Sequence, residues 1–299
     1  MDPWIIVFGL GVGVLIGMTG VGGGSLMTPL LILVFGIAPV TAIGTDLAYG
    51  AVTKTVGGWR HLRQGTVDLA LAGWMAVGSV PAAIVGVVAL KALQRGSGPG
   101  FDDTVLTAVG GALILGGAAL LARLLLGGTA GEREHAELRG RRRAVAVVLG
   151  AVIGFVLGVT SAGSGALISV ALILVFDLMP RRVVGTGVFH AAILLWAAAL
   201  AHLVAGDIDY ALAGTILLGS VPGVWIGSWL AMRVPVGALR TTLGVLLLGS
   251  GLALIQKGGV GIPSGVIAAF PAAVLAIICS AQVRARARRS QARAAAPTA

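Results

Sequence analysis

The sequence has few charged residues and almost no cysteine. Charged side chains make up 11% of the 299 residues, against about 25% in a typical soluble domain. Hydrophobic residues make up 57%, and their runs are too many and too long for one soluble core, which predicts a polytopic membrane protein. The single cysteine, Cys279, excludes an internal disulfide and is interpreted as a small packing residue.

The sequence also lacks the residue patterns of a catalytic site. It has no cluster of histidine, cysteine and carboxylate at metal-ligand spacing, and no Ser/His/Asp arrangement beyond what chance supplies. No Gly-Lys-Ser/Thr follows its glycine-rich segments, so a P-loop is excluded. Carboxylates and histidines within the apolar segments are too few for an embedded enzyme. We therefore expect no enzyme activity, no metal and no cofactor.

Acidic residues are outnumbered, with 11 Asp and Glu against 21 Lys and Arg and a net charge of +10. The arginines lie between and after apolar segments, as in cytoplasmic loops, and no basic domain exists outside those segments. Nucleic-acid binding is therefore not expected. Residues 1–20 are apolar with no preceding basic residue, which favours a retained segment over a cleaved signal peptide.

Two glycine-rich stretches are the most prominent features of the sequence. Residues 17–35 read GMTGVGGGSLMTPLLILVF and residues 158–176 read GVTSAGSGALISVALILVF. The apolar runs on either side are shorter than the roughly 20 residues of a crossing helix. Residues 4–38 and 145–178 are therefore each predicted to form a helical hairpin or re-entrant pair. Non-helical backbone at membrane depth requires burial in protein or a wet cavity.

The similarity between the two stretches extends into a long internal repeat. At a constant offset of 141 residues and without a gap, glycines, prolines, histidines and aspartates coincide in the two halves. The coinciding pairs include Gly22 with Gly163, Pro39 with Pro180, Thr45 with Thr186, His61 with His202, Asp68 with Asp209 and Pro81 with Pro222. Shared membrane composition alone would not keep polar residues and proline in register, so the sequence predicts a duplication.

The basic residues predict the relative orientation of the two halves. Placing the arginines of residues 60–63, 139–143, 181–182 and the C-terminal tail inside satisfies the positive-inside rule. This leaves Lys91, Arg95 and Lys257 outside. Residues 60–63 are then inside, while the matching segment of the second half, which includes residues 202–207, is outside. The halves are therefore predicted to be inverted, a plan common among secondary transporters.

These observations predict an all-α, polytopic transmembrane helical bundle of two inverted repeats. Each repeat has a glycine-rich helical hairpin plus three longer helices, and one extra C-terminal helix follows. The predicted parts are a first repeat (1–126), a hydrophilic cytoplasmic linker (127–143), a second repeat (144–256), the extra helix (257–283) and a basic cytoplasmic tail (284–299). The linker is interpreted as a solvated loop, with binding of a partner or of anionic lipid as the alternative. We expect a bacterial inner membrane location and a cytoplasmic C-terminus.

The glycine-rich motifs are candidates for an anion site. Small residues allow helices to pack closely, but they also let backbone N–H groups turn toward an anion at a helix start. Both explanations stay open for these motifs. The candidate substrate-binding residues are Thr19, Gly22, Gly23, Gly24, Ser25, Lys54, Thr160, Ser161, Gly163, Ser164 and Gly165.

Ionisable residues inside a membrane are costly to bury and are therefore functional candidates. Asp46 either carries a coupled proton or positions a helix by hydrogen bonding. Lys54, eight residues further on, either pairs with an anionic substrate or extends to the cytoplasmic surface as an anchor. His190 occupies the position of Tyr49 in the repeat and either lines the pore, as a second candidate for proton coupling, or packs with a hydrogen bond.

The remaining polar residues are assigned structural roles. His61 and His202 lie near segment ends and are interpreted as membrane-interface residues. Asp68 and Asp209 precede apolar segments and are predicted to cap the helices that begin there.

An ordered set of motifs resembles a known family. The motifs are Gly20-Val21-Gly22-Gly23-Gly24-Ser25-Leu26 with Pro29-Leu30-Leu31, then Gly44-Thr45-Asp46, Gly65-Thr66-Val67-Asp68, and the pattern around Pro81 and Gly86. Over about residues 4–255 the chain resembles the sulfite exporter TauE/SafE family of bacterial membrane proteins. The resemblance implies an integral transporter of small anions, commonly sulfite, sulfonates or related organic acids.

The second half departs from this pattern at two positions. Val170 stands where Pro29 would be repeated, and Gly187 stands where Asp46 would be. The function expected is a secondary transporter, and an exporter by the resemblance, that moves a small sulfur-containing anion by alternating access. The alternatives are an anion channel and a membrane scaffold that acts through the 127–143 linker. The expected partners are the small anion, the lipid bilayer and a coupled proton.

Overall fold

The computed structural model describes residues 3–19, 24–98, 100–125, 133–162, 165–231, 236–267, 269–276 and 280. Helices make up most of these residues. Within these ranges there is no β-strand, and a single isolated bridge pairs Arg133 with Leu178. The predicted α-helical bundle is therefore confirmed.

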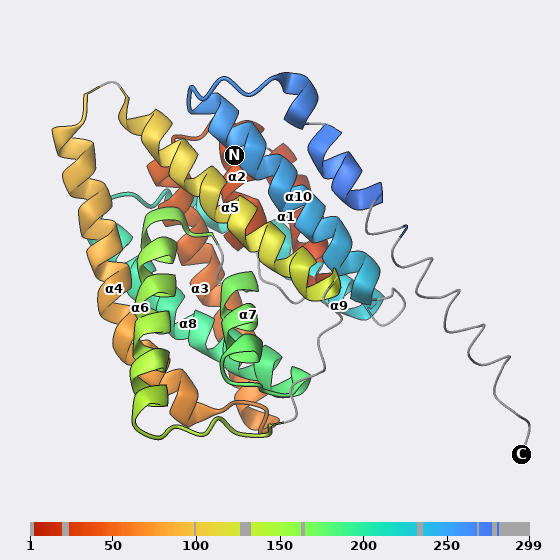
Figure 1. Cartoon of the computed structure of the whole chain (residues 1–299). Helices are drawn as coiled ribbons and strands as arrows, with labels where there is room; N and C mark the ends of the chain where they lie inside the picture. The colour runs from red at the N-terminus through yellow and green to blue at the C-terminus, as the bar shows by residue number, and fades with distance from the viewer. Residues whose placement is uncertain are drawn as a thin grey trace, which may run out of the picture.

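The helices of the first half precede the linker and those of the second half follow it (Figure 1). The first set is α1 (Pro3–Thr19), α2 (Gly24–Leu33), α3 (Pro39–Arg63), α4 (Leu69–Gly96) and α5 (Phe101–Leu125). The second set is α6 (Arg141–Thr160), α7 (Ala166–Leu174), α8 (Pro180–Ala205), α9 (Tyr210–Ala231) and α10 (Val236–Lys257). Residues 264–267 and 269–276 are also helical.

Helix length distinguishes two kinds of element. Within the described ranges, five helices are long and apolar enough to cross a membrane, namely α4, α5, α6, α8 and α9. By contrast, α2 has 10 residues and α7 has 9, which span about 15 Å, or half of a hydrocarbon core. Each glycine-rich segment thus separates a longer helix from a half-length one, as the short apolar runs predicted.

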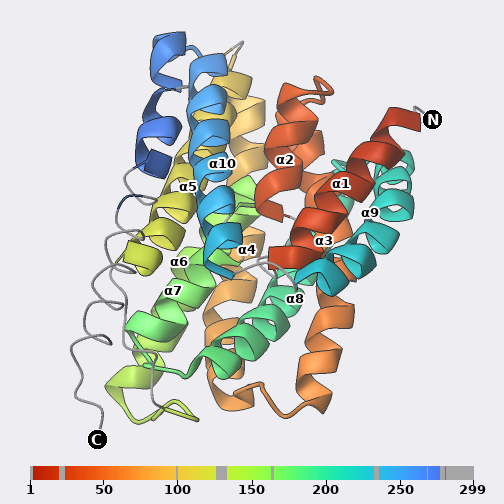
Figure 2. The ribbon, with the colours of Figure 1, turned by 90° about the vertical axis from the view of Figure 1, so that its right-hand side faces the viewer.

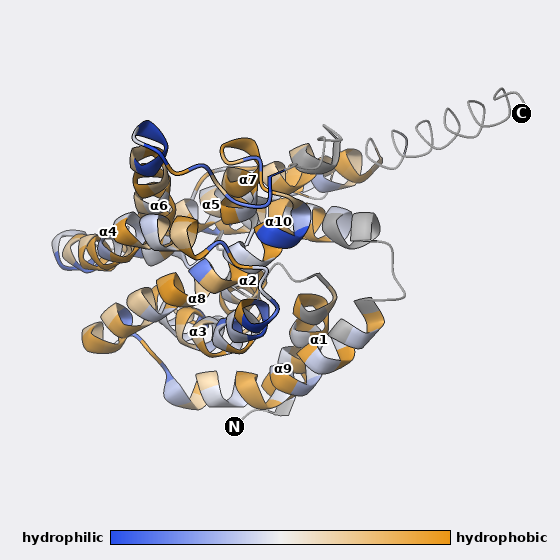
Figure 3. Ribbon diagram, turned by 90° about the horizontal axis from the view of Figure 1, so that it is seen from below, coloured by the Kyte–Doolittle hydropathy of each residue, from blue (hydrophilic) through white to orange (hydrophobic). Residues whose placement is uncertain are grey.

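The outer surface of the bundle is apolar. Hydrophobic residues colour the helices on every side in Figure 3, and hydrophilic residues gather mainly in connecting segments and at helix ends. Trp225 is 82% exposed and Leu174 is 74% exposed. Large apolar side chains exposed over many helices would make a soluble protein aggregate, whereas lipid tails cover them. The chain is a multi-pass membrane protein.

The helices pack in pairs that join the two halves. Helix α1 packs on α9, α4 on α6, α5 on α10 and α3 on α8 (Figures 1 and 2). In the α4–α6 pair, a Cβ atom on Gly150 would overlap the backbone of Met75, and one on Gly154 would overlap that of Ser79. Glycine therefore lets these two backbones approach closely, which is how small residues stabilise helix pairs in membranes.

The same contacts recur in the α1–α9 pair. A Cβ atom on Gly9 would meet the backbone of Ile216, and one on Gly13 would overlap that of Ser220. These four positions are the ones that the offset of 141 residues relates to the α4–α6 contacts. The glycines of the two halves thus serve equivalent packing roles.

Both predicted helix caps are present. The Asp68 carboxylate accepts a hydrogen bond from the backbone N–H of Leu71 at 3.0 Å. The Asp209 carboxylate does the same for the N–H of Leu212 at 2.9 Å. Each cap satisfies a donor that the first helical turn leaves free, and so fixes where α4 and α9 begin.

The caps are also tied across the two halves. The backbone N–H of Asp68 donates to the hydroxyl of Thr186 on α8 at 2.9 Å. The N–H of Asp209 donates to the hydroxyl of Thr45 on α3 at 3.1 Å. The two bonds are reciprocal, because a threonine hydroxyl of each half accepts a hydrogen bond from the cap residue of the other half. They lock the starts of α4 and α9 onto the opposite half.

The close approach of α4 and α6 is testable through Gly154. Gly154→Ala adds a methyl group where the Ser79 backbone leaves no space, so we expect the free energy of unfolding to fall by about 1–3 kcal/mol. Gly73→Ala on α4 is the matched control, because nothing lies within 4 Å of a Cβ atom there. Thermal unfolding in detergent micelles compares them. Equal midpoints for the two variants would contradict this packing.

Candidate functional site

A buried polar cluster joins the two halves near the glycine-rich motifs. Asp46 on α3 is fully buried, as are Thr28 on α2 and Ser161 at the end of α6. The Thr28 hydroxyl lies 2.6 Å from Asp46 Oδ2, and the Ser161 hydroxyl lies 2.9 Å from the same oxygen. The two hydroxyls are 2.6 Å apart. Three side chains from three elements thus converge on one point.

The end of α6 presents Ser161 to this cluster. Ser161 is the C-cap of α6 and adopts a left-handed conformation with φ 56°. Its backbone N–H still bonds to the carbonyl of Leu157 at 2.8 Å. A non-glycine residue at positive φ is uncommon and costs about 1–3 kcal/mol. The hydrogen bonds of the Ser161 hydroxyl help to hold that turn.

The neighbouring Thr160 forms its side-chain hydrogen bonds within its own turn instead. Its hydroxyl donates to the carbonyl of Val156 at 2.6 Å and accepts from the backbone N–H of Ala162 at 3.2 Å. Thr160 therefore acts within the end of α6, while Ser161 reaches across to the first half.

The other predicted site residues flank the same breaks. Thr19 ends α1, Gly24 and Ser25 begin α2, and Gly165 is the N-cap of α7. The helices therefore start where the motifs predicted helix starts. The remaining four candidates, Gly22, Gly23, Gly163 and Ser164, lie outside the described residues.

Two ionisable candidates lie deep inside the bundle. Lys54 is 6% exposed, and this burial favours a position facing the protein interior over the surface-anchor alternative. His190 on α8 is fully buried. This burial fits both of its interpretations, so the pore-lining role and the packing role stay predictions.

Thr28 is the cluster member that the sequence analysis missed. Asp46 and Ser161 were both candidates, but nothing in the sequence joined them. Thr28 follows Gly24 by four residues, which is one turn of the helix that the first motif begins. Helical spacing from the motif was therefore the signal available.

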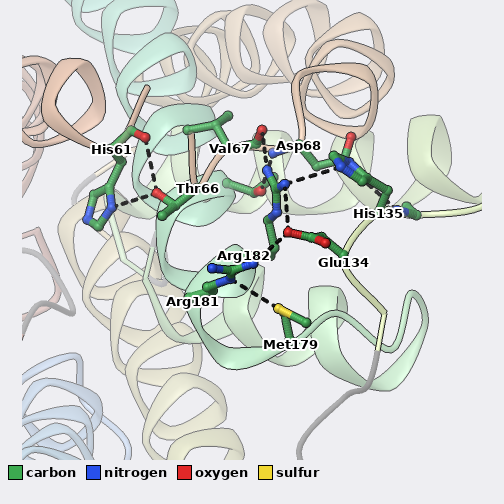
Figure 4. Close-up of polar contacts among 11 residues, drawn as sticks. His61, Thr66, Val67, Asp68, Glu134, His135, Met179, Arg181 and Arg182 are labelled. Carbon is green, nitrogen blue, oxygen red and sulfur yellow. Dashed lines mark hydrogen bonds and ion pairs between the residues drawn. The ribbon is translucent and has the colours of Figure 1, made fainter. Parts of the chain in front are cut away.

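One end of the bundle carries a network of basic and acidic side chains (Figure 4). Arg182 at the start of α8 donates to the carbonyl of Val67 at 3.1 Å. It also lies 3.1 Å from Nε2 of His135 and 3.4 Å from the carboxylate of Glu134. Its guanidinium is 9% exposed, so these linker residues bury it.

The linker is therefore not simply a solvated loop. The backbone N–H of Ala136 donates to Asp68 Oδ2 at 2.8 Å, and that of Arg133 donates to the carbonyl of Asp177 at 3.1 Å. The expectation of a solvated linker is wrong for Arg133 and Ala136, because their backbone groups bond to residues that directly precede α8 and α4. Glu137 stays exposed, and its hydrogen bond from Arg133 lowers its pKa.

The opposite end of the bundle has its own buried charge. Asp207, which follows α8, forms an ion pair with Lys91 from the last turns of α4. Its Oδ2 lies 2.9 Å from Nδ1 of His202, whose Nε2 lies 3.2 Å from the carbonyl of Gly158. His202 is fully buried in the last turn of α8, where this hydrogen-bonded network encloses the ring.

The Lys91–Asp207 pair is testable by neutralising one partner. Asp207→Asn leaves Lys91, 22% exposed, without its anion. We expect the free energy of unfolding to fall by about 2–3 kcal/mol, less than for a fully buried pair. Asp209→Asn is the matched control, because asparagine caps a helix as well as aspartate does.

Thermal unfolding midpoints of the two variants check this expectation. Adding Lys91→Met to Asp207→Asn should recover part of the loss, since the uncompensated charge is then removed as well. Equal stability of the two asparagine variants would show that the ion pair contributes nothing.

These features define a class: an α-helical, multi-pass membrane protein whose two halves meet at a buried polar cluster beside broken helices. Within that class, the chain belongs to the sulfite exporter TauE/SafE family, whose model matches residues 5–254. Family membership identifies it as a membrane transporter.

Curated relatives have names of the same kind. The probable membrane transporter protein YjnA of Bacillus subtilis strain 168 is 40% identical over 265 residues, covering 85% of this chain and all of the relative. YdhB, another probable membrane transporter protein of that organism, is 28% identical over 248 residues, covering 81% of this chain and 96% of the relative. No solved structure matches the chain.

Proposed function

We propose that the protein is a secondary transporter, and an exporter, of small sulfur-containing anions such as sulfite or sulfonates, working by alternating access. The observation that carries the proposal is the convergence of Thr28, Asp46 and Ser161 from both halves on one buried point. A polar cluster at the junction of two halves, beside helix breaks, is the usual place of a transporter's binding site. The family's description supports the substrate class.

The two halves are proposed to be inverted repeats. Reciprocal contacts support this arrangement: Gly150 meets Met75 as Gly9 meets Ile216, and the cap-to-threonine bonds are exchanged between the halves in the same way. Contacts exchanged in this way are those of a pseudo-twofold relation. Rocking of one half against the other about the shared cluster would then open the site to each side in turn.

The anion is proposed to bind at the starts of α2 and α7. Backbone N–H groups at a helix start, together with the helix dipole, favour a negative charge. The proposed ligands are the backbone of Gly22, Gly23, Gly24, Gly163 and Gly165 and the hydroxyls of Thr19, Ser25, Ser161 and Ser164. The Thr160 hydroxyl is not among them, because it donates within the last turn of α6. The buried Lys54 ammonium would supply positive charge toward the site.

The basic end of the bundle is proposed to face the cytoplasm of a bacterial inner membrane. Arg182 and the arginines that begin α6 lie at this end, where Arg143 stacks 5.3 Å from the ring centre of Trp74. Such an excess of arginine marks cytoplasmic segments. The C-terminus is then expected on the cytoplasmic side.

Uptake into proteoliposomes tests the proposal. Labelled sulfite and a short labelled sulfonate are offered to the purified protein with and without a pH gradient. A transporter should give saturable flux and counterflow, because alternating access handles one substrate per cycle. Flux that fails to saturate and shows no counterflow would indicate a channel. No flux of either anion through folded protein would contradict the proposed substrate class.

Two leucine variants test the position of the site. Gly23→Leu and Ser164→Leu place a bulky side chain in each motif and are expected to abolish saturable uptake without preventing membrane insertion. Gly11→Leu is the matched control, because nothing lies within 4 Å of a Cβ atom at Gly11. Full uptake by both motif variants would rule out this site.

A further inference from the structure

The three oxygens of the central cluster form a closed triangle. Thr28 Oγ1, Ser161 Oγ and Asp46 Oδ2 are separated by 2.6, 2.6 and 2.9 Å. Each of these distances is a hydrogen-bond distance between oxygens. At such a separation two oxygens attract one another only if a hydrogen lies between them.

The triangle requires three hydrogens, one for each of its three close contacts. Each hydroxyl supplies one hydrogen, so Thr28 and Ser161 together supply two. An ionised Asp46 supplies none, which leaves one of the three close contacts without a hydrogen. A protonated Asp46 supplies the third hydrogen, and each oxygen can then donate once and accept once around the ring.

The second oxygen of Asp46 points to the same conclusion. Oδ1 is buried and has no hydrogen-bond partner within the described residues. An ionised carboxylate carries half of its charge on that oxygen, and a buried charge without a partner is costly. The carbonyl oxygen of a neutral carboxyl group is far less costly to leave in that position.

The elements around Asp46 provide few charges to offset an ionised carboxylate. On α3 itself, Tyr49 lies one turn away and Lys54 lies two turns away, and the last turn contains Arg60, His61 and Arg63. Helix α2 has no titratable side chain. The titratable residues on the other helices that pack against α3 are Arg181, Arg182, His190 and His202 on α8, Tyr210 on α9, and Asp102, Asp103 and Arg123 on α5.

We propose that Asp46 carries a proton in this conformation, and that Thr28 and Ser161 close a ring of three hydrogen bonds around it. The ring ties α2 and α3 of the first half to the end of α6 in the second. Opening the ring as the halves move apart exposes the carboxyl group and releases the proton. Asp46 is thereby the proton-coupling residue of the transport cycle, a role that rests on the proposed transport function.

The charge of Asp46 has a direct consequence for an anionic substrate. A carboxylate beside the proposed anion site repels the substrate, whereas a neutral carboxyl group does not. The KM for a sulfonate, whose own charge is constant in this pH range, should therefore rise as the pH is raised and Asp46 loses its proton. In Asp46→Asn, which is neutral at every pH, the KM should not change with pH.

Infrared difference spectroscopy tests the proton itself. Wild-type protein, titrated with base in lipid, should lose a carboxylic acid C=O band that Asp46→Asn lacks at every pH. Thr28→Val keeps the side-chain size and removes one ring partner, so the band should persist at a shifted frequency. Ser79→Ala removes another buried hydroxyl, outside the ring, and should leave the band unchanged.

Two results would overturn the proposal. One is the same carboxylic acid band in wild type and Asp46→Asn, which would place the proton elsewhere. The other is transport driven by a Na⁺ gradient with a KM that ignores pH in the wild type. The infrared result does not depend on transport. If neither sulfite nor a sulfonate is transported but the band belongs to Asp46, the proposed function is wrong. The protonation of Asp46 within the ring is then still supported.

Discussion

The structure depends on the rule that polar groups buried away from water need partners. The helix breaks beside the glycine-rich motifs leave backbone and side-chain groups that lipid cannot satisfy. The described groups next to these breaks meet at the junction of the two halves. There the hydroxyls of Thr28 and Ser161 meet the carboxyl group of Asp46. Lipid covers the apolar outer faces, exemplified by Trp225.

Close packing between the two halves also stabilises the bundle. In hydrocarbon no hydrophobic effect drives two helices together, so association relies on van der Waals contact and interhelical hydrogen bonds. Glycines such as Gly13 and Gly154 let α1 approach α9 and α6 approach α4. The threonine-to-cap bonds of Thr45 and Thr186 add polar contacts across the same junction. Each half thus provides packing and hydrogen-bonding contacts for the other.

The two ends of the bundle are closed by different side-chain interactions. One end uses linker residues that bury the guanidinium of Arg182 (Figure 4). The other uses the Lys91–Asp207 pair with His202. The two ends of the bundle therefore bury different charges, an arginine at one end and an aspartate at the other.

The sequence by itself determined the class of protein, the helical bundle, the helix breaks at the motifs and the caps at Asp68 and Asp209. Each of these follows from local pattern: apolar run length, glycine clusters, and an acceptor before a helix. It also supplied Asp46 and Ser161 as separate candidates. Only the tertiary structure joined them, added Thr28, buried His202 and docked residues 133–138 of the linker. The physical reason is that hydrogen bonds between residues more than a hundred positions apart depend on how the helices pack, and no local pattern encodes that.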